Sequence, residues 1–88
     1  MPVFIYSRHA QEELVRRGIP KMLVDSVLSN PEQVVPEQGG RVTYQSRVDF
    51  GAGRIFLLRV IVVDQVDPAV VVTVYRTSKI EKYWRNTP

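Results

Sequence analysis

The stretch that most constrains the fold is residues 54–64 (RIFLLRVIVVD), because it is apolar on both faces of an extended strand. Arg59 is the one charged side chain inside it. A strand that is apolar on both faces must be covered on both sides, so it belongs in the middle of a sheet. We therefore predict a central strand here, interrupted by one arginine that needs a partner or a functional reason.

Two further strands are expected on either side of it. Residues 41–50 alternate, with apolar side chains on one face and the set Arg41, Thr43, Gln45, Arg47 and Asp49 on a wet face. Residues 51–53 (GAG) indicate a three-residue hairpin loop. Residues 69–76 (AVVVTVYR) are β-branched and aromatic and predict a last long strand, antiparallel to the central one. The result is a three-stranded meander, with residues 3–6 as a candidate fourth strand.

Two helices are predicted between the first apolar stretch and the meander. Residues 8–17 follow Ser7, a candidate N-cap, and end before Gly18, a candidate C′ glycine. Residues 21–29 form the second helix, which Asn30-Pro31 stops. Residues 31–40 (PEQVVPEQGG) are expected to be a loop with a central extended pair. The two helices therefore form a hairpin that packs on one face of the sheet.

A short C-terminal helix is expected after the last strand. Ser78 to Glu81 (SKIE) has the pattern of a capping box, and Ile80 and Trp84 lie four residues apart on one side. The predicted order is β-α-α-β-β-β-α. This is an α+β domain over residues 1–88, with an antiparallel sheet of three to four strands.

Composition narrows the class of protein further. A chain of 88 residues without cysteine has no disulfide or thiolate metal site, and it is small enough that self-association as a homodimer would help its stability. One histidine and no carboxylate pair at ligand spacing argue against a metal centre, so we expect no cofactor. No apolar run is long enough to span a membrane, and the N-terminus lacks a basic leader region. We therefore expect a cytoplasmic protein.

The excess positive charge lies at the C-terminal end. The net charge is +3, and residues 68–88 hold Arg76, Lys79, Lys82 and Arg85 against Glu81. Tyr83 and Trp84 accompany these cations, and such a basic, aromatic end suits a phosphate-bearing partner. The alternative is an ordinary solvated helix face.

His9 and Tyr75 are the candidate groups for proton transfer. His9 is the only histidine, and its ordinary pKa allows it to exchange protons near neutral pH. Tyr75 shares a face of the last strand with Thr73 and Thr77, a polar stripe that is unusual in a deep core. The alternative for His9 is a histidine held by hydrogen bonds for packing alone.

Cations on the strands and at the last helix are the candidate substrate-binding groups. Arg59 interrupts an apolar strand, and Arg47 lies on the wet face of its neighbour, so together they could cradle a phosphate. Lys79 enters the first turn of the last helix, where an anion nearby would explain a cation. The set is Arg47, Arg59, Arg76 and Lys79, and a solvated sheet face is the alternative.

Several short motifs resemble the domain-of-unknown-function 4258 family. They are residues 7–10 (SRHA), residues 17–19 (RGI), residues 27–31 (VLSNP) and residues 73–79 (TVYRTSK). The resemblance implies a place near RelE-like toxins and small ribonucleases, which pack two N-terminal helices on an antiparallel sheet. It also implies one site made by His9, Arg17, Thr73 and Tyr75. Members of the family commonly carry an arginine one turn after the histidine, and this chain has Glu13 there. They also carry a polar cap after Gly-Ile, and this chain has Pro20 there.

The activity that the resemblance implies is metal-independent cleavage of RNA in a toxin–antitoxin pair. His9 or Tyr75 would activate the ribose 2′-hydroxyl, and Arg17, Arg47, Arg59 or Lys79 would stabilise the charge on phosphorus. The products would be a 2′,3′-cyclic phosphate and a 5′-hydroxyl. The expected partners are RNA and an antitoxin-like protein. Two alternatives stay open: a non-catalytic RNA- or protein-binding member of the same fold, and a structural or regulatory subunit.

Overall fold

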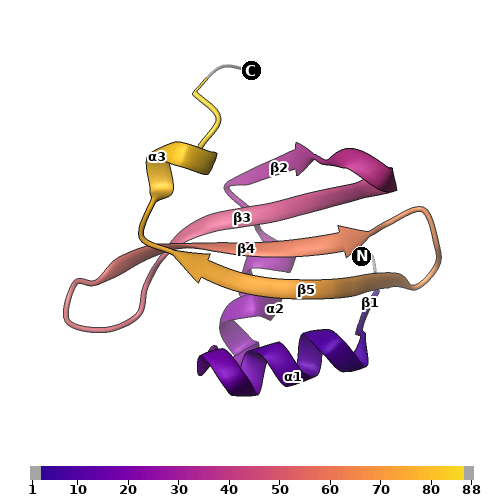
Figure 1. Cartoon of the computed structure of the whole chain (residues 1–88), viewed down its shortest axis with the longest axis horizontal. Helices are drawn as coiled ribbons and strands as arrows, with labels where there is room; N and C mark the ends of the chain where they lie inside the picture. Colours follow the sequence, from indigo (N-terminus) through magenta and orange to yellow (C-terminus); the bar gives the residue numbers. More distant parts are fainter. Residues whose placement is uncertain (1–2, 87–88) are drawn as a thin grey trace.

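The computed structural model describes residues 3–86 and has α+β architecture. Five strands form one sheet in the order β1-β5-β4-β3-β2, with β4 in the middle. Two helices and the sheet make the main layers, and a third short helix lies across the other side (Figure 1). The elements are β1 (Phe4–Tyr6), α1 (Arg8–Arg17), α2 (Lys21–Ser29), β2 (Gln33–Pro36), a 3-10 turn η1 (Gln38–Gly40), β3 (Arg41–Asp49), β4 (Ile55–Val63), β5 (Ala69–Thr77) and α3 (Ile80–Tyr83).

The sheet is larger than predicted and mixed rather than antiparallel. β2 lies in the segment expected to be a loop, and it pairs antiparallel with β3. Pro36 is tolerated there because β2 is an edge strand. β1 pairs parallel with β5, which makes the fourth predicted strand the one parallel member. The α+β class and the central place of β4 are confirmed.

The two N-terminal helices begin and end as their caps predict. The Ser7 side chain accepts a hydrogen bond from the backbone of Ala10, and Gly18 ends α1 in the left-handed conformation at φ 63°. α2 ends before Pro31, with Asn30 as its C-cap. Figure 1 shows both helices on the same side of the sheet. They form the predicted hairpin.

The main core lies between this hairpin and one face of the sheet. Ala10 and Leu14 of α1 and Val24 and Val27 of α2 are buried against strand residues. The strand residues of this core are Leu58, Val60, Val62, Ala69, Val71 and Val74. A bulge in β5 between the partners of Ile61 and Val62 lets both Val71 and Val74 face the helices. The simple alternation expected for residues 69–76 therefore breaks at Val72.

The other sheet face is covered at its centre, although the sequence pattern predicts a wet face, and only Arg41, Arg47 and Asp49 of that face of β3 are exposed as expected. Thr43 and Gln45 of β3 are fully buried, and so is Leu57 of β4. β2 and α3 account for this cover, because Gln45 hydrogen bonds to Gln33 of β2 and to the backbone oxygen of Tyr83. Figure 1 shows α3 on the side of the sheet opposite α1 and α2. The protein thus has a second, smaller packed layer.

The C-terminal helix is shorter than expected, and its capping box does not form. α3 spans Ile80–Tyr83, and its N-cap is Lys79, without a side-chain cap. Ahead of the helix, the Thr77 hydroxyl accepts a hydrogen bond from the backbone N–H of Lys79 at 3.0 Å. Trp84 follows the helix in extended backbone. Across residues 3–86, the structure has no helix of the length and apolarity that crossing a membrane requires.

Candidate functional site on the sheet face opposite the helical hairpin

Arg59 lies at the centre of the covered sheet face. It pairs with Gln45 of β3 on one side and with Tyr75 of β5 on the other. Only 7% of the residue is exposed. A buried guanidinium is costly unless its donors are satisfied, so its partners decide what it does.

Each nitrogen of the Arg59 guanidinium has an acceptor. Nε donates to Gln45 Oε1 at 2.8 Å, and Nη2 donates to Glu37 Oε2 at 2.9 Å. Nη1 donates to the Tyr75 hydroxyl. Thr43 also donates to Glu37, with its hydroxyl 2.6 Å from Oε2. We call the six residues Glu37, Thr43, Gln45, Arg59, Tyr75 and Tyr83 the Arg59 network.

Tyr75 and Tyr83 place two partly exposed phenols over the buried cation. The Arg59 guanidinium lies 4.3 Å from the centre of the Tyr83 ring, a cation–π distance. The two rings meet edge to face, with 6.3 Å between their centres. Tyr83 comes from α3 and Tyr75 from β5, so the strand-to-helix turn between them folds the two phenols together.

The environment moves the pKa values of the two phenols in opposite directions. Burial raises the pKa of Tyr75, although the hydrogen bond from Arg59 works against this. The positive charge of Lys82 lowers the pKa of Tyr83. Two titratable groups of the same type in contact, with pKa values pushed apart, are a typical acid–base arrangement.

Arg47 and Trp84 extend the same face beside the network. The Arg47 guanidinium lies 4.2 Å from the centre of the Trp84 ring and hydrogen bonds to Glu32 through Nη2 at 2.8 Å. Half of the Arg47 side chain is exposed. The pair therefore presents an aromatic ring and a cation to solvent, next to Gln33, which holds the backbone of Arg85.

The remaining candidates, Thr73, Lys79 and Arg76, lie in three different places. Thr73 pairs with Ile61 and is partly buried on the same face as Tyr75. Lys79 is exposed at the start of α3. Arg76 lies on the opposite, helix-covered face, with its guanidinium 4.5 Å from the Phe50 ring centre and 4.7 Å from that of Phe56. Arg76 is therefore separated from Arg47 and Arg59 by the sheet.

His9 and Arg17 belong to α1 and gather around Glu13 instead. Arg17 Nε donates to Glu13 Oε2 at 2.7 Å, and His9 Nε2 lies 3.5 Å from Oε1. Arg16 donates to both oxygens of Glu13. These hydrogen bonds, that of Arg16 first, lower the pKa of Glu13. Glu13, which stands where the family commonly has an arginine, is thus a buried anion in contact with Arg16, Arg17 and His9.

The expected common site of His9, Arg17, Thr73 and Tyr75 is not assembled. The first two lie on the helix side of the sheet, and the last two lie on the opposite face. The physical reason is the strand pleat, which sends Thr73 and Tyr75 away from the face that Val74 presents to the helices. The structure brings together Tyr75, Arg59 and Arg47, with Thr73 close by on the same strand.

Four members of the Arg59 network, Glu37, Thr43, Gln45 and Tyr83, were not predicted as site residues. Glu37 lies at the end of the segment expected to be a loop, and Gln45 lies on the strand face expected to be wet. Tyr83 had been noted only for its aromatic ring. The one available signal was the isolated arginine in an apolar strand, which required polar partners on the neighbouring strands. Within residues 3–86, no cluster of three or more His, Cys, Asp or Glu side chains could hold a metal ion.

Comparison with known proteins gives one match. The family model described as a domain of unknown function (DUF4258) matches residues 6–76. This range includes α1, α2 and all of the long strands, and it ends before α3. No curated protein and no solved structure matches the chain.

Proposed function

Because this chain belongs to the family described as a domain of unknown function (DUF4258), whose description names no activity, we propose a function from the Arg59 network. The function is metal-independent cleavage of RNA. The observation that carries the proposal is a buried guanidinium with two phenols of opposed pKa shift beside it. This set contains what phosphodiester cleavage needs from side chains: a fixed positive charge, a proton acceptor and a proton donor.

Arg59 is the group for the charge that develops on phosphorus. A guanidinium suits phosphate oxygens because its donors form a planar fork. Gln45, Glu37 and the Tyr75 hydroxyl hold this fork in one orientation, so little reorganisation is needed during reaction. Burial strengthens the effect, because the field of a charge is screened less away from water.

Tyr83 and Tyr75 divide the proton transfers between them. Tyr83, whose pKa the charge of Lys82 lowers, acts in its phenolate form and takes the proton of the ribose 2′-hydroxyl. The 2′-oxygen attacks phosphorus, and the bond to the 5′-oxygen breaks. Tyr75, whose pKa burial raises, gives its proton to that leaving oxygen. The products are a 2′,3′-cyclic phosphate and a 5′-hydroxyl, and DNA is excluded because it lacks the 2′-hydroxyl.

The surroundings of the network suit a single-stranded RNA. Trp84, with Arg47 beside it, offers a surface on which a base can stack. Lys79, at the N-cap of α3, and Lys82, within α3, are both exposed and would contact the phosphates on either side of the cleaved bond. Arg47 and Lys79 thus keep the binding role expected of them.

The toxin–antitoxin context remains part of the proposal. The short motifs that resemble the DUF4258 family, and through it imply RelE-like relatives, lie around the two ends of α1, at the end of α2 and at the end of β5. A helical hairpin on one face of a sheet is the arrangement that the resemblance implies. We propose a RelE-like toxin fold, a cytoplasmic ribonuclease, and an antitoxin-like protein as its regulator.

A second candidate function is RNA binding without cleavage. The observation that favours it is that Nε, Nη1 and Nη2 of Arg59 already donate to protein acceptors. One of these acceptors is the carboxylate of Glu37, which repels a phosphate. In this case Arg47, Trp84 and Lys79 bind the strand, and the Arg59 network only supports the surface.

One experiment separates the two functions. A fluorescent single-stranded RNA and a DNA of the same sequence are incubated with the protein in EDTA, and the products are identified by mass spectrometry. Cleavage of the RNA alone, with a 2′,3′-cyclic phosphate end, supports the ribonuclease. Binding of RNA that weakens with salt, without cleavage, supports the second candidate. If the protein neither binds nor cleaves the RNA, both proposed functions are contradicted.

A further inference from the structure

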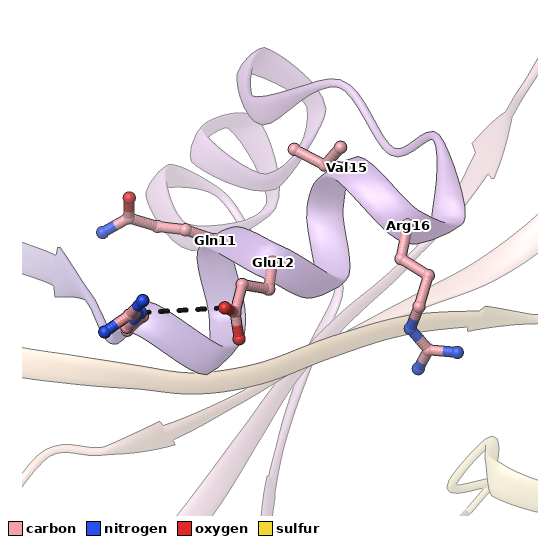
Figure 2. A pocket seen from close by; sticks show the side chains of 5 residues that line it. Gln11, Glu12, Val15 and Arg16 are labelled. Atoms are coloured by element: carbon pink, nitrogen blue, oxygen red, sulfur yellow. Dashed lines mark ion pairs between the residues drawn. The ribbon is translucent and has the colours of Figure 1, made fainter.

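The outer face of α1 carries a shallow hollow that the Arg59 network does not use. Its lining side chains come from one helix at spacings of three and four residues, so they share one stripe. They are Arg8, Gln11, Glu12, Val15 and Arg16. Figure 2 shows Arg16 further along the helix than Glu12. Val15 is 84% exposed in the middle of this stripe. A valine this exposed gains from a partner that covers it.

A second hollow lies next to the first and shares Gln11 and Val15 with it. Its other walls include Leu14 and the turn between the helices, with Gly18 and Pro20. Val15 is therefore a ridge between two depressions. This shape suits another helix that presents its own ridge and its own depressions, as in helix-to-helix packing.

The charges on the stripe are complementary to a reversed copy of themselves. Glu12 pairs with Arg8 of its own helix at 3.7 Å. Arg16, one turn further on, donates to Glu13 through Nη2, and 66% of its side chain is exposed, so its other nitrogens can meet a second partner. If two α1 helices pack antiparallel about a twofold axis beside Leu14 and Val15, Glu12 of each copy faces Arg16 of the other. Both ion pairs form at once, because a twofold interface repeats every contact.

We propose that the outer face of α1 is a homodimer interface, with α1 packed antiparallel on α1 of a second copy. Val15 of each copy enters a depression of the other, beside the other copy's Val15. One helix face buries less area than a standard interface, so we expect a weak dimer with a dissociation constant on the order of 100 μM. The Arg59 network lies across the sheet and stays open in this dimer.

The first test compares two substitutions that add the same charge. Sedimentation equilibrium of the full chain over a range of concentrations gives the dissociation constant. Val15→Arg places a charge in the interface, and we expect it to weaken dimerisation by about tenfold or more. Met22→Arg is the matched control, because Met22 is 75% exposed on α2 and lines neither hollow. It should leave the dissociation constant within about twofold.

The second test reverses the charges that face each other. Glu12→Arg places an arginine opposite Arg16 of the other copy, and the twofold axis repeats this repulsion. The variant should weaken the dimer by about tenfold. Adding Arg16→Gln to the same chain removes the facing arginine, keeps a donor beside Glu13, and should return part of the affinity. Thermal melting of each variant checks that the fold is kept. A wild-type chain that stays monomeric at millimolar concentration would overturn the proposal. Equal behaviour of Val15→Arg and Met22→Arg, or no recovery in the double variant, would overturn it too.

Discussion

Arg59 and Tyr75 face each other across β4 and β5, and the guanidinium of the first donates a hydrogen bond to the hydroxyl of the second. This contact ties a buried charge to a partly exposed phenol on the sheet face away from α1. Gln45 and Glu37 complete the cation's partners on the other side. The contact therefore lies at the centre of the site for which we propose RNA cleavage.

Removal of the Arg59 charge should destabilise the fold strongly. Arg59→Met leaves Gln45 and Glu37 without their donor in a buried place, and we expect the free energy of unfolding to fall by about 3 kcal/mol. Arg59→Lys should recover only part of this, because an ammonium lacks the planar fork. Urea unfolding measures both. Arg54→Met, at an exposed position, is the control and should change stability by less than about 0.5 kcal/mol.

Trp84 should report on whatever binds beside the Arg59 network. It is the only tryptophan, and the Arg47 guanidinium stacks on its ring. We expect its fluorescence to change during titration with single-stranded RNA, as bases stack on it or displace Arg47. Arg47→Ala should alter the starting emission and weaken RNA binding by about fivefold at low salt. An RNA that binds without any change at Trp84 would place the interface elsewhere.

Stability should fall in acid, and Glu13 should account for part of the fall. Hydrogen bonds from Arg16 and then Arg17 hold the Glu13 pKa below its ordinary value. A carboxylate whose pKa is lowered by folding stabilises the protein above its unfolded pKa, and this stability is lost as the pH falls through the folded pKa. We therefore expect the melting temperature to drop below about pH 4.5. The pKa of Asp25 is lowered mainly by a hydrogen bond from Tyr6, and the pKa of Glu32 mainly by a hydrogen bond from Arg47. Both carboxylates therefore add to the drop.

Two single substitutions isolate the share of Glu13. Glu13→Gln removes the buried carboxylate, so the variant should be less stable near pH 7 and should lose less stability on going to pH 3. Glu12→Gln is the control, because Glu12 is mostly exposed and only pairs with Arg8. Thermal melts at half-unit pH steps give both curves. Identical acid slopes in the Glu13→Gln variant and the wild type would contradict this role for Glu13.

Local signals in the sequence predicted the helices and the long strands, because these elements carry their own information. Ser7 and Gly18 mark the ends of α1, and the apolar pattern of residues 54–64 places β4 in the middle of the sheet. β2 was missed because its pairing with β3 is a long-range contact and Pro36 is typical of a loop. The capping box predicted for α3 does not form because Lys79, and not Ser78, holds the N-cap position, and no side chain caps the helix.

The site was only partly predictable for a related reason. The alternation of residues 41–50 separates two faces, but it does not say which short elements cover the polar one. Here β2 and α3 bury Gln45 and bring Tyr83 over Arg59. The position of His9 relative to Tyr75 depends on which face of β5 meets α1, and the bulge at Val72 obscures this in the pattern.

The most direct test of the central claim compares His9→Ala with Tyr75→Phe in one RNA cleavage assay. Circular dichroism confirms the fold of each variant, and Tyr44→Phe, on the helix-covered face, is the control for Tyr75→Phe. If the Arg59 network cleaves RNA, Tyr75→Phe should lower the rate of cyclic phosphate formation by about 100-fold. His9→Ala and Tyr44→Phe should leave it within about twofold. Loss of cleavage in His9→Ala, with Tyr75→Phe fully active, would contradict the account.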